Sequence, residues 1–262
     1  MPGSAEAAER PHPPGDPAGT NGAALLEARG LVKAFGGLRA VNDLSFGVRP
    51  GEILGLLGPN GSGKTTVFNL LAGAQIPDRG VVTFEGRDIT GLAPHRRAAL
   101  GIVRTFQLVR ALAGLPVLDN VLVARLYGRL RATDARAARN EAMECLRFVG
   151  LARDAARPAA ALTLGERKRL EVARALAAGP RLLLLDEPAA GLNPTEVAAL
   201  LALIRGLRAG GMTIVIVEHN VGAIRELCDR VVVLNAGRKI AEGLPEDALD
   251  HAAVVEVYLG AT

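Results

Sequence analysis

Hydrophobic positions follow different spacings along this chain. Near the N-terminus, Leu44 and Phe46 alternate with polar residues, and a period of two predicts a strand with one buried face. Three later runs are apolar at every position, which is typical of parallel strands buried on both faces. These runs cover residues 182–185, 214–217 and 231–234. The pattern predicts a β-rich lobe followed by the strands of a parallel core.

Between these strand patterns the spacing becomes helical. Strand signals fade from about residue 94 to residue 179, and residues 134–149 carry one apolar face at helical spacing. That face comprises Ala135, Ala138, Ala142, Cys145, Leu146 and Val149. Further on, Asn193 and Glu196 form the capping-box pattern of another helix. The chain therefore starts and finishes in one core, with a helical excursion in between.

Composition narrows the class of protein. The chain has 262 residues, of which 49% are hydrophobic, enough for a substantial core. No window approaches eighteen consecutive apolar residues, so we expect a protein that is soluble or peripheral to a membrane. The 31 Lys and Arg residues only slightly outnumber the 27 Asp and Glu residues, and Trp is absent. Because these basic residues are scattered, composition argues against a nucleic-acid partner.

The composition of the N-terminal segment and the spacing of the two cysteines each predict a further property of the chain. Residues 1–22 are rich in Pro and Gly and lack the apolar segment of a signal peptide, so we expect a disordered tail before a domain at 23–262. Cys145 and Cys228 lie far apart without CxxC spacing, so we expect buried, reduced thiols.

The clearest chemistry lies in a glycine-rich loop between a short apolar strand at 53–57 and a helix pattern. Its residues are Gly58, Pro59, Asn60, Gly61, Ser62, Gly63, Lys64, Thr65 and Thr66. Glycines let successive backbone N–H groups approach phosphate oxygens at the start of a helix. Lys64 can reach the outer phosphates, and the Thr65 hydroxyl can ligate Mg²⁺. This phosphate loop by itself leaves kinases, GTPases and ATPases open.

The next informative pair is Asp186 and Glu187, which follow the four leucines of the run 182–185. Adjacent carboxylates at the end of a buried strand are costly unless they meet a cation. Asp186 can hold the shell of a magnesium ion through water, and Glu187 is suited to polarise an attacking water. The alternative is an ordinary acidic strand end.

Taken together, these motifs resemble those of the ATP-binding cassettes of ABC transporters, over essentially all of residues 25–260. Gln107, in Arg104-Thr105-Phe106-Gln107, resembles the Q-loop glutamine that reaches magnesium and water, and His219 matches the switch histidine near the γ-phosphate. The D-loop corresponds to Gly191, Leu192 and Asn193. The signature segment corresponds to Thr163, Leu164, Gly165 and Glu166.

Two parts of this resemblance are ambiguous. The signature segment departs from Leu-Ser-Gly-Gly-Gln because Thr163, Leu164 and Glu166 replace Ser, Gly and Gln. Thr163 to Glu166 is also a capping-box pattern for a helix through Leu176, and Glu166 places negative charge near a phosphate site. Phe35 resembles the aromatic residue that stacks on adenine, although core packing is the alternative.

The resemblance implies an α/β fold: a P-loop NTPase core with a mixed sheet, an antiparallel β subdomain and an inserted helical subdomain at about 94–179. It implies an ATPase that uses ATP and Mg²⁺ at the cytoplasmic face of the inner membrane. Since the signature segment of one subunit completes the site of another in this family, we expect a second cassette, identical or different, as partner. Transmembrane permease subunits, and indirectly a solute-binding protein, complete the expected assembly.

Within the family, the segments 104–107, 186–194 and 254–260 resemble one of the ATP-binding subunits of branched-chain amino-acid importers. Cassettes of lipopolysaccharide export share the last segment and remain an alternative. A nucleic-acid ABC ATPase would need a long coiled-coil insertion, and the stretch between Gln107 and Thr163 is too short for one. A GTPase would need an Asn-Lys-x-Asp segment, which is absent.

Overall fold

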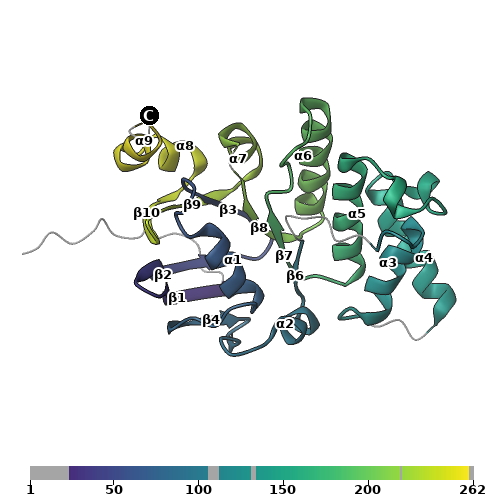
Figure 1. The fold of residues 1–262 in the computed structure, drawn as a ribbon, viewed down its shortest axis with the longest axis horizontal. Helices are drawn as coiled ribbons and strands as arrows, with labels where there is room; N and C mark the ends of the chain where they lie inside the picture. The colour runs from purple at the N-terminus through teal and green to yellow at the C-terminus, as the bar shows by residue number, and fades with distance from the viewer. Residues whose placement is uncertain (1–23, 106–111, 131–133, 219, 260–262) are drawn as a thin grey trace, which may run out of the picture.

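The computed structural model describes residues 24–105, 112–130, 134–218 and 220–259. Two sheets with helix α1 (Lys64–Ala72) between them form the left and centre of Figure 1, and helices α3 to α5 lie at its right-hand end. Within the described residues, no helix combines the length and apolar character needed to cross a bilayer.

The six-stranded sheet is the centre of the molecule, in the order β10-β9-β3-β8-β7-β6. Its strands are β3 (Ile53–Leu57), β6 (Ile102–Arg104), β7 (Leu182–Asp186), β8 (Thr213–Val217), β9 (Arg230–Asn235) and β10 (Arg238–Gly243). All neighbouring pairs are parallel except β9 and β10, so the sheet is mixed, as predicted. The apolar runs 182–185, 214–217 and 231–234 are completely or almost completely buried, which confirms them as two-sided core strands.

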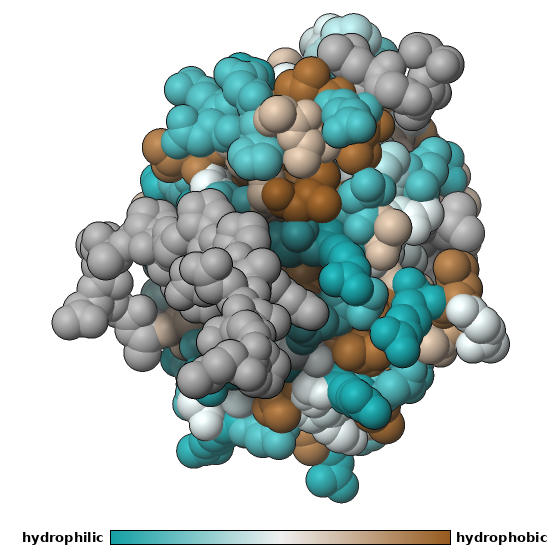
Figure 2. All heavy atoms as spheres, turned by 90° about the vertical axis from the view of Figure 1, so that its left-hand side faces the viewer, coloured by the Kyte–Doolittle hydropathy of each residue, from teal (hydrophilic) through white to brown (hydrophobic). Residues whose placement is uncertain are grey.

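The second sheet is antiparallel, with the order β2-β1-β4-β5. Its strands are β1 (Leu26–Phe35), β2 (Leu38–Val48), β4 (Arg79–Phe84) and β5 (Arg87–Asp88). Leu44, Phe46 and Val48 are buried and pack with α1 against one face of the six-stranded sheet, as their alternation predicts. The left-hand end of Figure 1 faces the viewer in Figure 2. On the described residues of this surface, hydrophobic side chains are interspersed among hydrophilic ones and form no continuous apolar band.

Helices cover the other face of the six-stranded sheet (Figure 1). They are α5 (Leu164–Ala177), α6 (Pro194–Ala209), α7 (Val221–Leu227), α8 (Pro245–Leu249) and α9 (Ala252–Leu259). The capping box of Asn193 and Glu196 is formed at the start of α6, with Pro194 in its first turn. The α/β architecture with an antiparallel part and a helical insertion is therefore confirmed.

Residues 94–179, which the sequence predicts to be mostly helical, contain α2 (Pro94–Leu100), α3 (Val117–Tyr127), α4 (Ala135–Phe148), α5 and two short 3₁₀ helices at Ala152–Asp154 and Ala159–Ala161. On α4, Ala138, Ala142 and Leu146 are buried, whereas Ala135 in its first turn is exposed. Strand β6 also lies within residues 94–179 and pairs with β7. The sequence did not predict it, because three residues are too few to show a periodicity.

Both cysteines are free thiols, and Cys228 is buried while Cys145 is only partly so. Burial raises the pKa of Cys228 to about 12 and also raises the pKa of Cys145. Because the thiolate is the reactive form, neither group is a nucleophile at neutral pH. The chemistry of the chain lies elsewhere.

Arg97 on α2 is fully buried and ties the end of α1 to the turn before α2. Its guanidinium donates to the backbone carbonyls of Leu70, Leu71, Thr90 and Leu92. Burial lowers the pKa of Arg97 to about 10, so it remains charged at neutral pH and is suited to the negative C-terminal end of α1. This arrangement fixes the helix that begins in the phosphate loop.

Replacing Arg97 by Met tests this brace. The free energy of unfolding, measured by urea denaturation, should fall by about 3 kcal/mol, because buried carbonyl groups lose their donors. Arg96→Met is the matched control, since Arg96 is the exposed neighbour on the same helix and its loss should cost less than about 0.5 kcal/mol. Equal losses in the two variants would contradict a bracing role for Arg97.

Candidate functional site

The candidate site lies where three neighbouring strands end at the same level. In β8, Val217 pairs with Leu56 of β3 on one side and with Asp186 of β7 on the other. The segments that follow β3, β7 and β8 therefore leave the sheet together. We call this the carboxyl edge, and it brings the phosphate loop and Glu187 to one place.

The phosphate loop is wedged between two other segments, and this explains its glycines. A Cβ on Gly58 would lie 2.2 Å from the carbonyl oxygen of Leu234. A Cβ on Gly63 would lie 2.3 Å from the carbonyl oxygen of Ala40. Both glycines also have positive φ angles, of 143° and 105°, which L side chains rarely adopt. Only glycine satisfies both restrictions here.

Lys64, the first residue of α1, is folded into its own loop. Its Nζ donates to the carbonyl oxygens of Gly58 (2.7 Å) and Pro59 (2.9 Å), and the side chain is buried. Burial lowers the pKa of Lys64, and the nearby charge of Glu187 partly opposes this change. The ammonium group is thus already positioned inside the loop, at the N-terminal end of a helix that favours an anion.

Asp186 and Glu187 differ in their surroundings. Asp186 is 4% exposed at the end of β7, and Glu187, directly after it, is partly exposed. The backbone of Glu187 has a φ of 46°, a conformation that costs a non-glycine residue roughly 1–2 kcal/mol. Its N–H donates to Val217 O (3.0 Å), which holds this turn against β8. Strained positions of this kind concentrate at functional sites.

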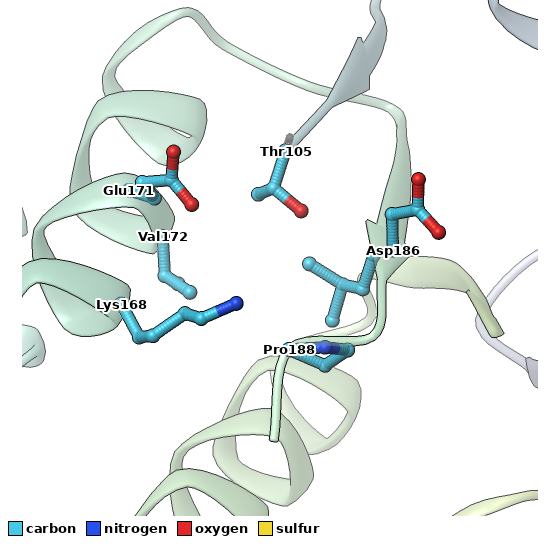
Figure 3. A pocket seen from close by; sticks show the side chains of 7 residues that line it. Thr105, Lys168, Glu171, Val172, Asp186 and Pro188 are labelled. Carbon is cyan, nitrogen blue, oxygen red and sulfur yellow. The ribbon is translucent and has the colours of Figure 1, made fainter. Parts of the chain in front are cut away.

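Lys168 of α5, the helix that begins in the signature segment, brings a positive charge to this turn. Lys168 of α5 is buried, and its Nζ lies 3.4 Å from the carbonyl oxygen of Glu187. Figure 3 shows Lys168 and Glu171 extending from α5 toward the end of β7, beside Thr105. The helix that begins in the signature segment therefore contacts the backbone of the proposed catalytic carboxylate.

The signature segment forms the capping box that its sequence suggests. Thr163 Oγ1 accepts from the Glu166 N–H (3.2 Å), and Glu166 Oε2 accepts from the Thr163 N–H (2.8 Å). Arg157 lies 3.4 Å from the same Glu166 oxygen. The negative charge of Glu166 is thus partly compensated and engaged within the chain.

The D-loop packs directly on the signature segment. A Cβ on Gly191 would lie 3.1 Å from Leu164, and a Cβ on Gly165 would lie 2.5 Å from Glu196, which caps α6 with Asn193. Leu192 packs against the larger core cluster. The signature segment and the D-loop therefore form one continuous surface of this chain.

Gln107, His219 and Phe35 are further residues that the sequence assigns to the site. Gln107 and His219 lie outside the described residues. Phe35 ends β1 with 47% of its surface exposed, and Lys33 Nζ lies 5.8 Å from the centre of its ring. Core packing is thus wrong for Phe35, and adenine stacking stays a prediction.

The structure adds residues that the sequence did not single out. Arg104 lies between α1 and Asp186, Glu218 accepts a hydrogen bond from the Ala189 N–H (2.8 Å), and Tyr258 of α9 lies close to the backbone of Gly58. Glu218 is buried next to His219, the proposed switch residue, and a charged residue directly after the apolar strand β8 was the signal that could have identified it. The contact of Tyr258 joins elements far apart in sequence, so no local pattern could reveal it.

Comparisons with known proteins agree with this geometry. Residues 41–190 match the family model described as ABC transporter. This chain belongs to the ATP-binding cassettes of ABC transporters. Residues 238–262 match a second model, described as branched-chain amino acid ATP-binding cassette transporter. As a member of this family, the cassette binds nucleotide and hydrolyses ATP.

The similarity to individual relatives extends over nearly the whole cassette. The chain is 41% identical to the high-affinity branched-chain amino acid transport ATP-binding protein BraF of Pseudomonas aeruginosa, over 90% of this chain and 98% of BraF. It is 39% identical to the lipopolysaccharide export system ATP-binding protein LptB of Acidithiobacillus ferridurans, over 90% and 97%. The ADP conformation of the ATP-binding cassette MJ1267 superposes with a TM-score of 0.82, at 32% identity over 90% and 99%.

The glycine packing gives a direct test of the loop. We expect Gly63→Ala to weaken nucleotide binding at least about tenfold, because its Cβ would displace the loop from Ala40. Gly86→Ala is the control, since Gly86 has a similar positive φ of 75° but nothing within 4 Å of the added Cβ. Titration with a fluorescent ATP analogue checks both, and affinity within twofold of wild type for Gly63→Ala would refute this explanation.

Proposed function

We propose that this cassette drives the import of branched-chain amino acids by hydrolysing ATP at the carboxyl edge. The observation that carries the ATPase site is the common end of β3, β7 and β8, which brings the phosphate loop with Lys64 and the turn with Glu187 to the same edge of the sheet. The choice of solute is supported by the resemblance to BraF and by the match of residues 238–262. Selection of the amino acid itself would belong to the permease and an external solute-binding protein.

A magnesium ion fits the side chains at this edge. Thr65 is exposed at the start of α1, and Asp186 ends the neighbouring part of the sheet. The buried Oγ of Ser62 has no hydrogen-bond partner among the described residues, and it lies inside the loop beside Gly58. Magnesium is typically held by one or two protein groups together with substrate phosphates, and this donor set suits that arrangement. Thr65 would hold the ion directly, Asp186 would hold it through water, and bound magnesium would draw charge from the phosphate oxygens.

Glu187 is proposed as the general base for water. Its carboxylate follows Asp186, and its strained backbone is held from β8 and from Lys168. Lys64 would transfer its hydrogen bonds from the carbonyls of Gly58 and Pro59 to the outer phosphates. Because charge develops on these oxygens during phosphoryl transfer, a fixed cation at this place stabilises the transition state. Gln107 and His219 are proposed, on the family resemblance alone, as the sensor and switch residues.

A second cassette and a permease complete the proposed assembly. The signature segment of one copy would close the nucleotide site of the other, with Gly165 and the hydroxyl of Thr163 at the N-terminal end of α5. The contact of Leu164 with Gly191 would connect that closure to the D-loop. The helices within 94–179, proposed as a subdomain, would pass the motion to permease subunits, and the cassette would lie peripherally at the cytoplasmic membrane face.

Glu187→Gln separates binding from hydrolysis. We expect its ATPase rate to fall at least about 100-fold, because general-base catalysis is lost, while ATP affinity stays within about threefold. Glu246→Gln is a control in the exposed first turn of α8 and should retain full activity. A Glu187→Gln cassette that hydrolyses ATP at the wild-type rate would remove Glu187 from the proposed role.

Uptake measurements test the solute. Cells that lack this chain should regain uptake of labelled leucine, isoleucine or valine when the wild-type chain is restored, and should not regain it with Glu187→Gln. Co-purification with permease subunits identifies the partner in the same cells. Restored lipopolysaccharide export without any change in amino-acid uptake would overturn the proposed solute and favour the alternative cassette.

A further inference from the structure

Arg104 occupies an unusual position, between the phosphate-loop helix and the carboxylate at the end of β7. Its Nη2 lies 2.6 Å from Asp186 Oδ2, and its Nη1 donates to Asn69 Oδ1 at 2.6 Å. The guanidinium carbon also lies 5.7 Å from the centre of the Phe68 ring. The side chains of Arg104 and Asp186 are only 13% and 4% exposed.

These contacts place the cation next to the proposed magnesium ligands. Asn69 lies four residues after Thr65 on α1, so their side chains share one face of that helix. Asp186 is the carboxylate that would hold magnesium through water. Nη1 of Arg104 therefore binds the helix that carries Thr65, and Nη2 binds Asp186, the other proposed magnesium ligand.

We propose that Arg104 is an internal counter-ion that holds Asp186 until magnesium arrives and that competes with magnesium for this carboxylate. This inference rests on the proposed magnesium site. Arg104 touches neither the reacting phosphate nor water in this scheme, so it is a positioning residue.

Burying an ionised carboxylate costs free energy, because the group loses its hydration. An ionised group at 4% exposure is strongly destabilising without a partner, and Arg104 compensates it in the chain itself. A divalent cation near Asp186 compensates the same charge, so the two cations act on one group and repel each other. Each therefore weakens the other's hold on Asp186, and this coupling is reciprocal. The contacts with Asn69 and Phe68 keep the guanidinium close to the carboxylate in either state.

Removing Arg104 should consequently make magnesium more effective. The measurement is the magnesium concentration that gives half of the magnesium-dependent increase in affinity for a fluorescent ADP analogue. We expect this midpoint to fall about fivefold or more in Arg104→Met. Arg104→Lys keeps a positive charge near Asp186 and should give a smaller fall.

A matched control separates this effect from a general loss of packing. Arg230 and Glu52 form a second buried ion pair, at 2.9 Å and with 16% and 8% exposure, at the opposite end of β3 and β9. Arg230→Met should lower the melting temperature without moving the magnesium midpoint. Arg104→Met should also melt earlier, but magnesium with nucleotide should raise its melting temperature more than that of wild type.

The result that overturns the proposal is a magnesium midpoint in Arg104→Met that equals or exceeds that of wild type. If Arg104→Met does not fold, Asn69→Ala takes its place, because it removes a hydrogen bond of the guanidinium and keeps the charges of Arg104 and Asp186. The magnesium midpoint of Asn69→Ala should fall, but by less than that expected for Arg104→Met. An unchanged midpoint in folded Asn69→Ala would then overturn the proposal. Wild-type protein whose nucleotide binding ignores magnesium would refute the proposed metal site itself, so the two failures are distinguishable.

Discussion

Compensation of charge at the carboxyl edge is the constraint on which the rest of this site depends. Asp186 ends a parallel strand with both faces covered, and its side chain is almost completely buried. The side chain of Lys64 is buried in the same way inside the phosphate loop. Each charge is therefore matched within the chain, Asp186 by Arg104 and Lys64 by the carbonyls of Gly58 and Pro59. Arg104 supplies Asp186 with positive charge, as a metal ion would, and the two carbonyl oxygens supply Lys64 with negative partial charge, as phosphate oxygens would. Binding would then move the hydrogen bonds of Lys64 from these carbonyls to phosphate oxygens and would bring magnesium close to the Arg104–Asp186 pair, with the loop itself already formed.

The second constraint is the close approach of backbone segments around this edge. Gly58 and Gly63 allow the loop to contact Leu234 and Ala40, and Gly165 allows α5 to contact the cap of α6. The capping boxes at Thr163 and Asn193 begin both helices next to each other. The unusual Glu166 has a structural explanation here, because it closes the cap of α5 and pairs with Arg157. The signature segment is thus a firmly folded helix start that presents Thr163 and Leu164 outward.

Much of this arrangement is local enough to be predicted from the sequence. The two-sided strands, the capping boxes and the phosphate loop each depend on neighbouring residues, and the structure has them at the expected places. The short strand β6 could not be predicted, because its pairing with β7 is non-local and three residues carry no period. The partners Arg104 of Asp186 and Lys168 of Glu187 were also missed, since each joins residues far apart in the chain. The prediction that Ala135 lies on the buried face of its helix was wrong. Helical spacing places Ala135 on the apolar face, but the first turn of α4 extends beyond the core.

Lys64 is thus held by its own loop until the phosphates of a nucleotide replace the loop carbonyls as its partners. A crystal structure of Glu187→Gln grown with ATP and magnesium tests this exchange most directly. The account predicts phosphates within the loop of residues 58–66, with Lys64 Nζ about 3 Å from phosphate oxygens and released from at least one of the carbonyls of Gly58 and Pro59. Nucleotide bound away from this loop, or Lys64 still on both carbonyls beside a bound triphosphate, would contradict it.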